Sequence, residues 1–379
     1  MNNISGTKII SSIFSDITDP RSAKNSQNLL LELIIMTICA VICGAEGWED
    51  IETFAKERED WLRRYLTLPY GVPGHDTFRR VFSRINPEEL QRCFRRWVRA
   101  VFHFTGKQVI AIDGKSLRRS FANGHEKHKG MIHMVSAWAA ENELILGQIK
   151  TQEKSNEITA IPKLLKLLAI EGCIITIDAM GCQKKIAEQI ITQKADYVLA
   201  VKENQGTLYN AMNTTFQQAQ NLKFKNMVYD QYKEIDSGHG RIETRQCTIL
   251  PLMYLHQFKL KWRGLQSLVL IESRREMNDQ IQMEKRYYIT SLPMKAHLLM
   301  ISIRQHWGIE NRLHWVLDVV FREDESRIRK DHGAANFAVV RHMALNLLKH
   351  EHSNKFSIKK KRYVATLNPQ YLEKVLQGA

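Results

Sequence analysis

The sequence predicts an α/β protein whose mixed sheet carries an all-β insertion and follows a helical N-terminal region. Three observations predict this class. Residues 1 to about 100 contain only helical patterns, and from residue 108 to about 219 short apolar strand patterns alternate with amphipathic helices. Residues 224 to 290 contain paired strand patterns separated by turn residues. With 379 residues, the chain is long enough to divide into two or three units.

The helical region is expected to contain four main helices, at 29–43, at 48–66, from Asp76 or Thr77, and after the capping pair Asn86-Pro87. The last two helices are strongly basic through Arg79, Arg80, Arg84, Arg92, Arg95, Arg96 and Arg99. They form a candidate DNA-facing unit similar to a helix-turn-helix. The alternative is a merely solvated basic face, because no base-reading signature stands out.

The α/β half begins with three expected antiparallel strands, at 108–112, 131–140 and 144–151. A helix at 158–169, a strand at 174–177, a helix at 183–194, a strand at 197–201 and a helix at 207–219 follow. Two hairpins are then expected, one around Ser237-Gly238-His239-Gly240 and one around Met277-Asn278-Asp279. A further helix is expected at 334–350. A basic tail with Lys355, Lys359, Lys360, Lys361 and Arg362 follows, and then a short helix near 369–376.

Residues 301–321 predict an amphipathic helix whose polar face carries groups that could bind a ligand. At 3.6 residues per turn, one face is apolar, with Ile303, Ile309, Leu313, Val316, Leu317 and Val320. The other face carries Trp307, Glu310, Asn311, His314 and Asp318. Two carboxylates, an imidazole and an amide are more polar groups than a solvated helix needs to stay soluble. This face either meets a ligand or is a surface pair of acids beside a satisfied histidine.

Composition indicates the class of partner and the compartment. The chain has 55 lysines and arginines against 40 aspartates and glutamates, a net charge of +15, which favours nucleic acid as the partner. The six cysteines form no C-x-x-C pair and predict reduced thiols in a cytoplasmic, nucleoid-associated protein. The longest apolar run, 29–44, is interrupted by Glu32 and Thr37 and predicts a buried helix without a membrane partner.

Three acids are placed to act together. Asp113 follows the strand at 108–112, Asp178 follows the strand at 174–177, and Glu310 lies on the late helix. Singly, an aspartate after a strand is more often a turn residue. Three converging carboxylates suit a pair of hard divalent cations, which activate an attacking oxygen and stabilise a leaving one in phosphodiester transfer.

Several long motifs resemble those of bacterial insertion-sequence DDE transposases, and more narrowly the H-repeat-associated proteins linked to Rhs elements. They are AIDGKSLRRS (111–120), TIDAMGCQKKIA (176–187), YVLAVKENQ (197–205), GHGRIETR (238–245), RYYITSL (286–292) and HWGIENRLHWVLDVVFREDESRIR (306–329). The similarity covers nearly the whole chain. It implies a ribonuclease-H-like core with Asp113, Asp178 and Glu310 as the catalytic and metal-binding triad. It also implies Mg²⁺ or Mn²⁺ as cofactor and cleavage and strand transfer at element ends.

The resemblance also indicates residues that contact DNA. The broader transposase group has Tyr, Arg and Lys around the last acid, where this chain has Ile303, His306 and Leu317. Arg304, Asn311, His314 and Arg322 are the candidate substitutes for phosphate or end binding. Lys115, Arg118, Arg119 and Lys202, within the shared motifs, complete the expected DNA-binding set. The partners implied are double-stranded DNA, as element ends and target, and a second copy forming a homodimer on DNA.

The predicted organisation is a helical DNA-binding or associated domain at 1–104, a catalytic domain at 105–350 with its insertion at about 222–292, and a basic tail at 351–379. A P-loop ATPase is disfavoured because the required first glycine falls at Val109. A zinc protease is disfavoured because H-E-x-x-H is absent. The alternative that stays open is an inactive or domesticated transposase relic that binds DNA without catalysing transposition.

Overall fold

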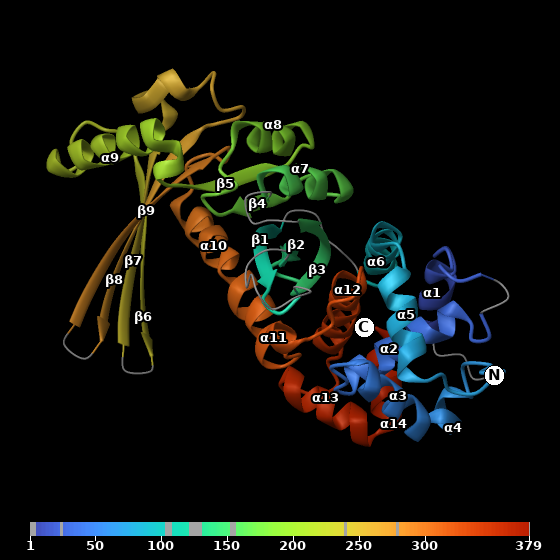
Figure 1. The fold of residues 1–379 in the computed structure, drawn as a ribbon. Coiled ribbons are helices and arrows are strands. Elements are labelled where there is room, and N and C mark those ends of the chain that lie inside the picture. Colours follow the sequence, from blue (N-terminus) through green and yellow to red (C-terminus); the bar gives the residue numbers. More distant parts are fainter. Residues whose placement is uncertain are drawn as a thin grey trace.

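A computed structural model describes residues 5–22, 26–102, 108–120, 131–151, 157–238, 241–277 and 280–378. It contains a helical body, a mixed sheet and a long β arm that projects from the sheet (Figure 1). The helices are α1 (Ser5–Phe14), α2 (Leu30–Ile42), α3 (Trp48–Glu57), α4 (Glu59–Leu62), α5 (His75–Arg84), α6 (Pro87–Val101), α7 (Glu157–Leu167), α8 (Lys184–Thr192), α9 (Gly206–Asn221), α10 (Ala296–His306), α11 (Trp315–Val319), α12 (Gly333–His350), α13 (Ile358–Leu367) and α14 (Pro369–Gln377).

The strands are β1 (Val109–Leu117), β2 (Ile132–Ala139), β3 (Leu144–Thr151), β4 (Ile174–Ile177), β5 (Asp196–Val201), β6 (Asp230–Gly238), β7 (Arg241–Pro251), β8 (Ser267–Met277) and β9 (Gln280–Thr290). Within the described ranges they form one nine-stranded sheet in the order β3-β2-β1-β4-β5-β9-β8-β7-β6. β1 and β3 pair antiparallel with β2, whereas β1, β4 and β5 run parallel. The predicted mixed α/β class and the antiparallel opening strands are confirmed.

The strands predicted as an all-β insertion continue the central sheet. β9 pairs antiparallel with β5, and the two expected hairpins, β6 with β7 and β8 with β9, follow outward. α9 covers one face near the base of the arm, where Phe216 packs beside Tyr287, and Met300 of α10 packs into the cluster on the other face. The far half of the arm extends beyond both helices (Figure 1). Turn residues 239–240 and 278–279 lie outside the described residues.

The helical body is organised around α12. Its residues from Gly333 to Leu348 are all buried, and α2 is buried on nearly every side, so other elements enclose both helices. α12 contacts α2, α5 and α6 and also β3. Asn346 on α12 accepts a hydrogen bond from the Ile145 amide at 3.0 Å and donates one to its carbonyl at 3.1 Å. The N-terminal helices and the sheet therefore share one core, and the boundary predicted between 104 and 105 lies outside the described residues.

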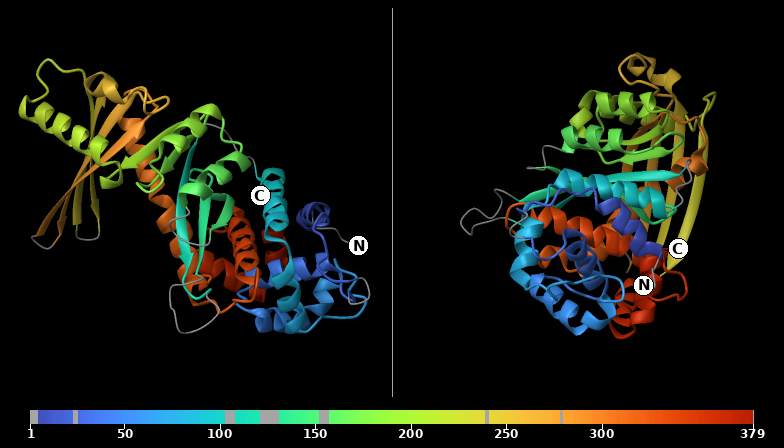
Figure 2. Two further views of the ribbon diagram at one scale, coloured as in Figure 1. Left: turned by 45° about the horizontal axis from the view of Figure 1, so that its top comes forward. Right: turned by 90° about the vertical axis from the view of Figure 1, so that its right-hand side faces the viewer.

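The predicted basic tail is folded into helices α13 and α14, which pack against α2 and α12 (Figure 2). Lys361 is buried, and its ammonium donates to the Leu348 carbonyl at 2.8 Å. Arg362 is also buried and donates to the carbonyls of Val41, at 3.1 Å, and Val320. These two cations therefore hold the fold together rather than facing solvent.

Two predicted helices are interrupted. The helix predicted at 48–66 breaks at Arg58, after which Trp61 turns inward and donates to the Glu373 carboxylate at 2.9 Å. The helix predicted at 301–321 begins earlier, at Ala296, and is broken by a π-helical turn at Glu310–His314 before α11. A π turn widens the helix by one residue and is frequent at functional sites.

All six cysteines are free thiols, as expected. None of the helices in the described ranges combines the length and the apolarity needed to span a bilayer.

The buried cation of α13 yields a stability prediction. Replacing Arg362 with Ala leaves the Val41 and Val320 carbonyls without their donor, which costs about 1 to 3 kcal/mol per buried group. Thermal unfolding of Arg362→Ala should therefore occur several degrees below the wild-type midpoint. Lys359→Ala, an exposed position on the same helix, is the matched control and should unfold at the wild-type temperature. Equal midpoints for the two variants would contradict the structural role of Arg362.

Candidate active site

Two aspartates lie next to each other on neighbouring parallel strands. Ile112 of β1 is paired with Ile177 of β4, so the next residues along the two strands are Asp113 and Asp178. Adjacent strands are about 4.8 Å apart, and equivalent positions on parallel strands project to the same face. The pairing therefore brings the two carboxylates together, although they are 65 positions apart in the sequence.

The sequence pattern predicted that Asp113 would follow the end of its strand, and this is wrong. β1 runs on to Leu117, and Asp113 lies in its middle, opposite Ser136 of β2. The strand continues past Gly114 because β2 supplies hydrogen-bonding partners along its whole length, whereas β4 ends at Ile177. Asp113 is thus fixed by a paired backbone, and Asp178 lies at the first position after its strand.

The two aspartates have raised pKa values. Burial, followed by the negative charges of Asp178, Glu157 and Glu310, raises the pKa of Asp113 to about 7, against a hydrogen bond from the Gly114 amide. Burial also raises the pKa of Asp178, and the charge of Glu157 adds to it, against hydrogen bonds such as the one from the Gly181 amide. Within the described ranges, no lysine or arginine forms an ion pair with either aspartate. Among the described residues, their negative charge is therefore poorly balanced.

Glu310 is exposed at the start of the π turn that follows α10. α10 contacts β1, β4 and β5, so its end lies over the strands that carry the aspartates. Glu310 is near enough to raise the pKa of Asp113. In the described part of the chain, however, no three His, Cys, Asp or Glu side chains converge closely enough to hold a metal ion by themselves.

Two histidines of the predicted helix lie beneath this site. Nδ1 of His314 is 3.5 Å from Oδ2 of Asp113, and burial, together with the charge of Lys115, lowers the His314 pKa to about 3. Nδ1 of His306 is 3.0 Å from the Thr176 hydroxyl, and burial lowers the His306 pKa to about 4. Both imidazoles are therefore neutral at pH 7, and neither balances the charge of the aspartates.

Lys115, predicted to contact DNA, is largely buried. Its side chain is 11% exposed, and its ammonium pairs with Asp318 and, at 2.8 Å, with Glu323. Glu323 also lies 3.6 Å from Arg341 of α12. This network fixes α11 and the segment after it against β1.

His314 was also predicted to contact DNA but is buried, whereas the other predicted DNA-contacting residues lie at the surface. Arg118 and Arg119 are exposed at the end of β1, with Arg118 3.1 Å from Asp324. Lys202 is exposed after β5, and its charge lowers the pKa of Asp178. Arg304 pairs with Glu234 of the arm. Asn311 is exposed beside Glu310. Arg322 has a left-handed backbone conformation and pairs with Glu325 and Glu46.

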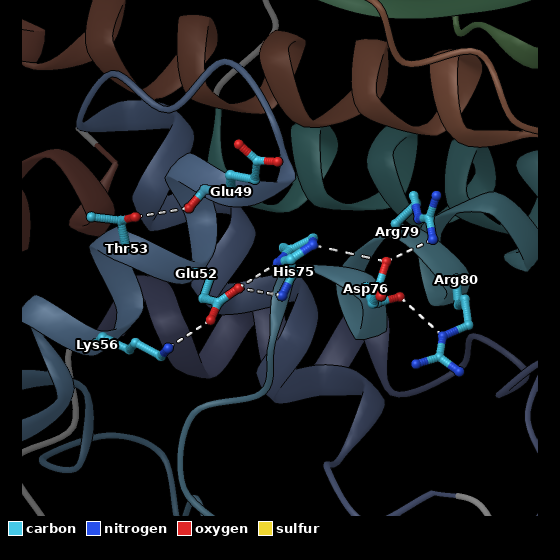
Figure 3. A network of polar contacts seen from close by, with 8 residues as sticks. All are labelled: Glu49, Glu52, Thr53, Lys56, His75, Asp76, Arg79 and Arg80. Atoms are coloured by element: carbon cyan, nitrogen blue, oxygen red, sulfur yellow. Dashed lines mark hydrogen bonds and ion pairs between the residues drawn. The ribbon is translucent and has the colours of Figure 1, made fainter.

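The arginines of α5 and α6 are only partly available to a ligand. Arg79 pairs with Asp76 at 2.6 Å, and Arg80 donates to the Asp76 carbonyl at 3.2 Å (Figure 3). Arg96 pairs with Asp16, and Arg99 donates to the Leu167 carbonyl at 3.1 Å. A pocket of about 530 Å³ beside α5 has a balanced lining of four acids and four bases: Glu46, Glu49, Asp50, Asp76, Arg79, Arg327, Arg329 and Lys330. Its charge does not favour a phosphate, and it includes none of the three predicted acids.

Sequence reasoning missed a group beside Asp113. Glu157, the first residue of α7, is buried and pairs with buried His133 of β2. His133 is also 2.8 Å from the Ser116 hydroxyl. A lone glutamate at a helix start gives no signal in a single sequence, because acids are favoured there for helix stability alone.

Comparisons with known proteins show which sequences this chain is similar to. Residues 104–347 match the family described as "Transposase DDE domain", and residues 11–98 match the one described as "DDE_Tnp_1-associated". The chain is 43% identical to the "H repeat-associated putative transposase YhhI" of Escherichia coli K12, over 96% of this chain and 97% of that one. It is 43% identical to the "Putative transposase YncI" of Escherichia coli O157:H7, over 96% and 93% respectively. A shorter K12 relative, "Inactive transposase YbfQ", is 47% identical over 17% of this chain and 79% of its own length.

The raised pKa of Asp113 predicts a pH-dependent stability. A carboxyl whose folded pKa is raised stabilises the fold fully only below its unfolded pKa, near 4, and that stability is lost as the pH rises through about 7. Asp113→Asn removes this dependence, so the metal-free variant should be more stable than wild type at pH 8. The difference should shrink toward pH 5. The scale is about 1.4 kcal/mol per pKa unit. Thermal unfolding across this range tests the prediction, and a constant difference between the proteins would contradict it.

Proposed function

The chain belongs to the transposase DDE domain family, and from this membership we propose that it cleaves DNA at the ends of an insertion sequence and transfers the freed strand to target DNA. The observation that carries the proposal is the register of β1 and β4. It sets Asp113 and Asp178 side by side with no lysine or arginine of the described chain paired to them. Such a pair favours a divalent cation as its counter-charge.

The donor atoms fit Mg²⁺ or Mn²⁺. Mg²⁺ is usually held by one or two carboxylates together with waters and substrate phosphates, so a full protein cage is not needed. Asp113 and Asp178 would hold the ion, and Glu310 would join them from the π turn. When bound, such ions activate the attacking oxygen and stabilise the leaving oxygen of phosphodiester transfer.

The surrounding residues have separate tasks in this proposal. His314 holds the Asp113 carboxylate in place as a neutral imidazole, leaving the negative charge of the aspartates available to the cation. Lys115 braces α11 through Asp318 and Glu323. Lys202, Arg118, Arg119 and Asn311 are exposed and are proposed to contact DNA phosphates, because such contacts position a duplex without reading its sequence. The net charge of +15 favours the same partner.

We further propose that the core is ribonuclease-H-like. The order β3-β2-β1-β4-β5, with three antiparallel strands followed by two parallel ones, supports it. The arm would then be an insertion between β5 and α10, and the helical body a scaffold that binds DNA. We expect a homodimer when the protein is assembled on DNA.

A relic that binds DNA without cutting it is the second candidate. Two observations favour it: Glu310, Asp113 and Asp178 do not converge into a metal cage in the described chain, and a related protein is named an inactive transposase. Cleavage assays separate the two candidates.

The decisive test incubates the purified protein and Mg²⁺ with DNA that carries the flanks of its own coding sequence. Cuts should appear at the element boundary. Asp178→Asn and Glu310→Gln keep side-chain size and lose the charge, so cleavage should fall about 10³-fold or more while DNA binding in a gel-shift assay persists.

Asp318→Asn is the matched control on the same helical segment. Its rate of DNA cleavage should be closer to that of wild type than the rate of Glu310→Gln is. It should unfold at a lower temperature than wild type, because Lys115 loses a carboxylate partner. Cleavage by Glu310→Gln at the wild-type rate would refute the role of Glu310. A wild-type protein that binds the flanks but never cuts them would favour the relic.

A further inference from the structure

A buried hydrogen-bonded chain leads from Ser116 to Glu157 directly beside Asp113. The Ser116 hydroxyl is 2.8 Å from Nδ1 of His133, and Nε2 of His133 contacts Oε1 of Glu157. The side chains of His133 and Glu157 are only 3% and 5% exposed. Ser116 and His133 are themselves cross-strand partners in the register of β1 and β2, so the sheet positions the Nδ1 end of the imidazole and α7 positions the Nε2 end.

Gly114, the residue after Asp113, creates the space for this carboxylate. A Cβ at position 114 would lie 2.5 Å from Nε2 of His133 and 2.7 Å from Cδ of Glu157, closer than real contacts allow. Glu157 therefore lies against the backbone of β1, one residue from Asp113. Only glycine permits that approach, which gives the Asp-Gly pair a reason other than a turn.

Glu157 is also close to Asp178. Its charge is among the causes that raise the pKa of both aspartates, and for Asp178 it is the first charge to do so after burial. A glutamate that merely closed an ion pair with His133 would not need to lie against Gly114, next to Asp113. Burying a further carboxylate beside two like charges is costly unless a cation is shared among them.

We propose that Glu157 is a fourth carboxylate of the metal site, held by His133 so that it binds the same divalent cation as Asp113 and Asp178. The proposal rests on the proposed function and adds a ligand to it. The hydrogen bond to His133 falls on Oε1, which leaves Oε2 for the ion. Hydrogen-bonded partners that orient metal-binding side chains typically change metal affinity 10- to 100-fold when they are removed. Ser116 and His133 would be such partners.

The test measures Mn²⁺ binding to the full chain without DNA, by the loss of the free-ion electron paramagnetic resonance signal. Wild type should bind Mn²⁺, and Glu157→Gln should bind it about 10- to 100-fold more weakly, as Asp178→Asn does. Mn²⁺ should also raise the unfolding temperature of wild type more than that of Glu157→Gln. This second readout is independent of activity and shows that the variant is folded.

Glu351→Gln is the matched control, because Glu351 is another buried, hydrogen-bonded glutamate, paired with Tyr371 of α14. It should lose stability but keep wild-type Mn²⁺ affinity. Gly114→Ala should weaken Mn²⁺ binding when Glu157 is present and have a smaller effect in a Glu157→Ala background, where the added methyl still meets His133 but no longer meets the carboxylate.

The outcomes are distinguishable. If Asp178→Asn loses Mn²⁺ and Glu157→Gln binds it like wild type, the fourth carboxylate is overturned while the proposed function stands. If wild type binds no Mn²⁺, the metal-dependent function and the inference built on it both fail.

Discussion

The pairing of Ile112 with Ile177 is the constraint on which the site depends. Two short apolar strands, far apart in the chain, are aligned so that each delivers an aspartate to the same place. A shift of one residue in this register would turn one carboxylate to the opposite face of the sheet. The surrounding core therefore has to hold the register firmly. Burial on both faces does so, because Ile110, Ile112 and Ile175 are all inaccessible to solvent.

Among the described residues, the ion pairs that lysines and arginines form near the two aspartates are made with other acids. Lys115, two residues along β1 from Asp113, is directed to Asp318 and Glu323 instead. His314, which does contact Asp113, is buried and neutral. α12 carries Arg341 toward Glu323 and joins the sheet to the N-terminal helices through Asn346. The helical body thus supports the site mechanically, and its hydrophobic core is continuous with that of the sheet.

Much of this was predictable from one sequence, and the failures have physical causes. The periodicity of apolar residues and the positions of turn residues located most helices and strands, because both signals are local in the sequence. Asp113 was placed at a strand end because the Asp-Gly pair indicates a turn, whereas pairing with β2 keeps the strand extended. Arg362 was assigned to a tail because its charge predicts exposure, but carbonyls from two distant segments enclose it. The role of Glu157 depends on its closeness to Gly114, which no spacing in the sequence encodes.

The central claim is that the β1 and β4 register builds a cation site from Asp113 and Asp178. The most direct measurement is a crystal structure of the protein soaked in Mn²⁺, with the ion located by anomalous scattering. The account predicts a peak between these two carboxylates, with oxygen ligands about 2.0 to 2.3 Å away, as is typical of small hard cations. A structure in which Mn²⁺ occupies other surface acids and leaves the aspartate pair without a peak would contradict it.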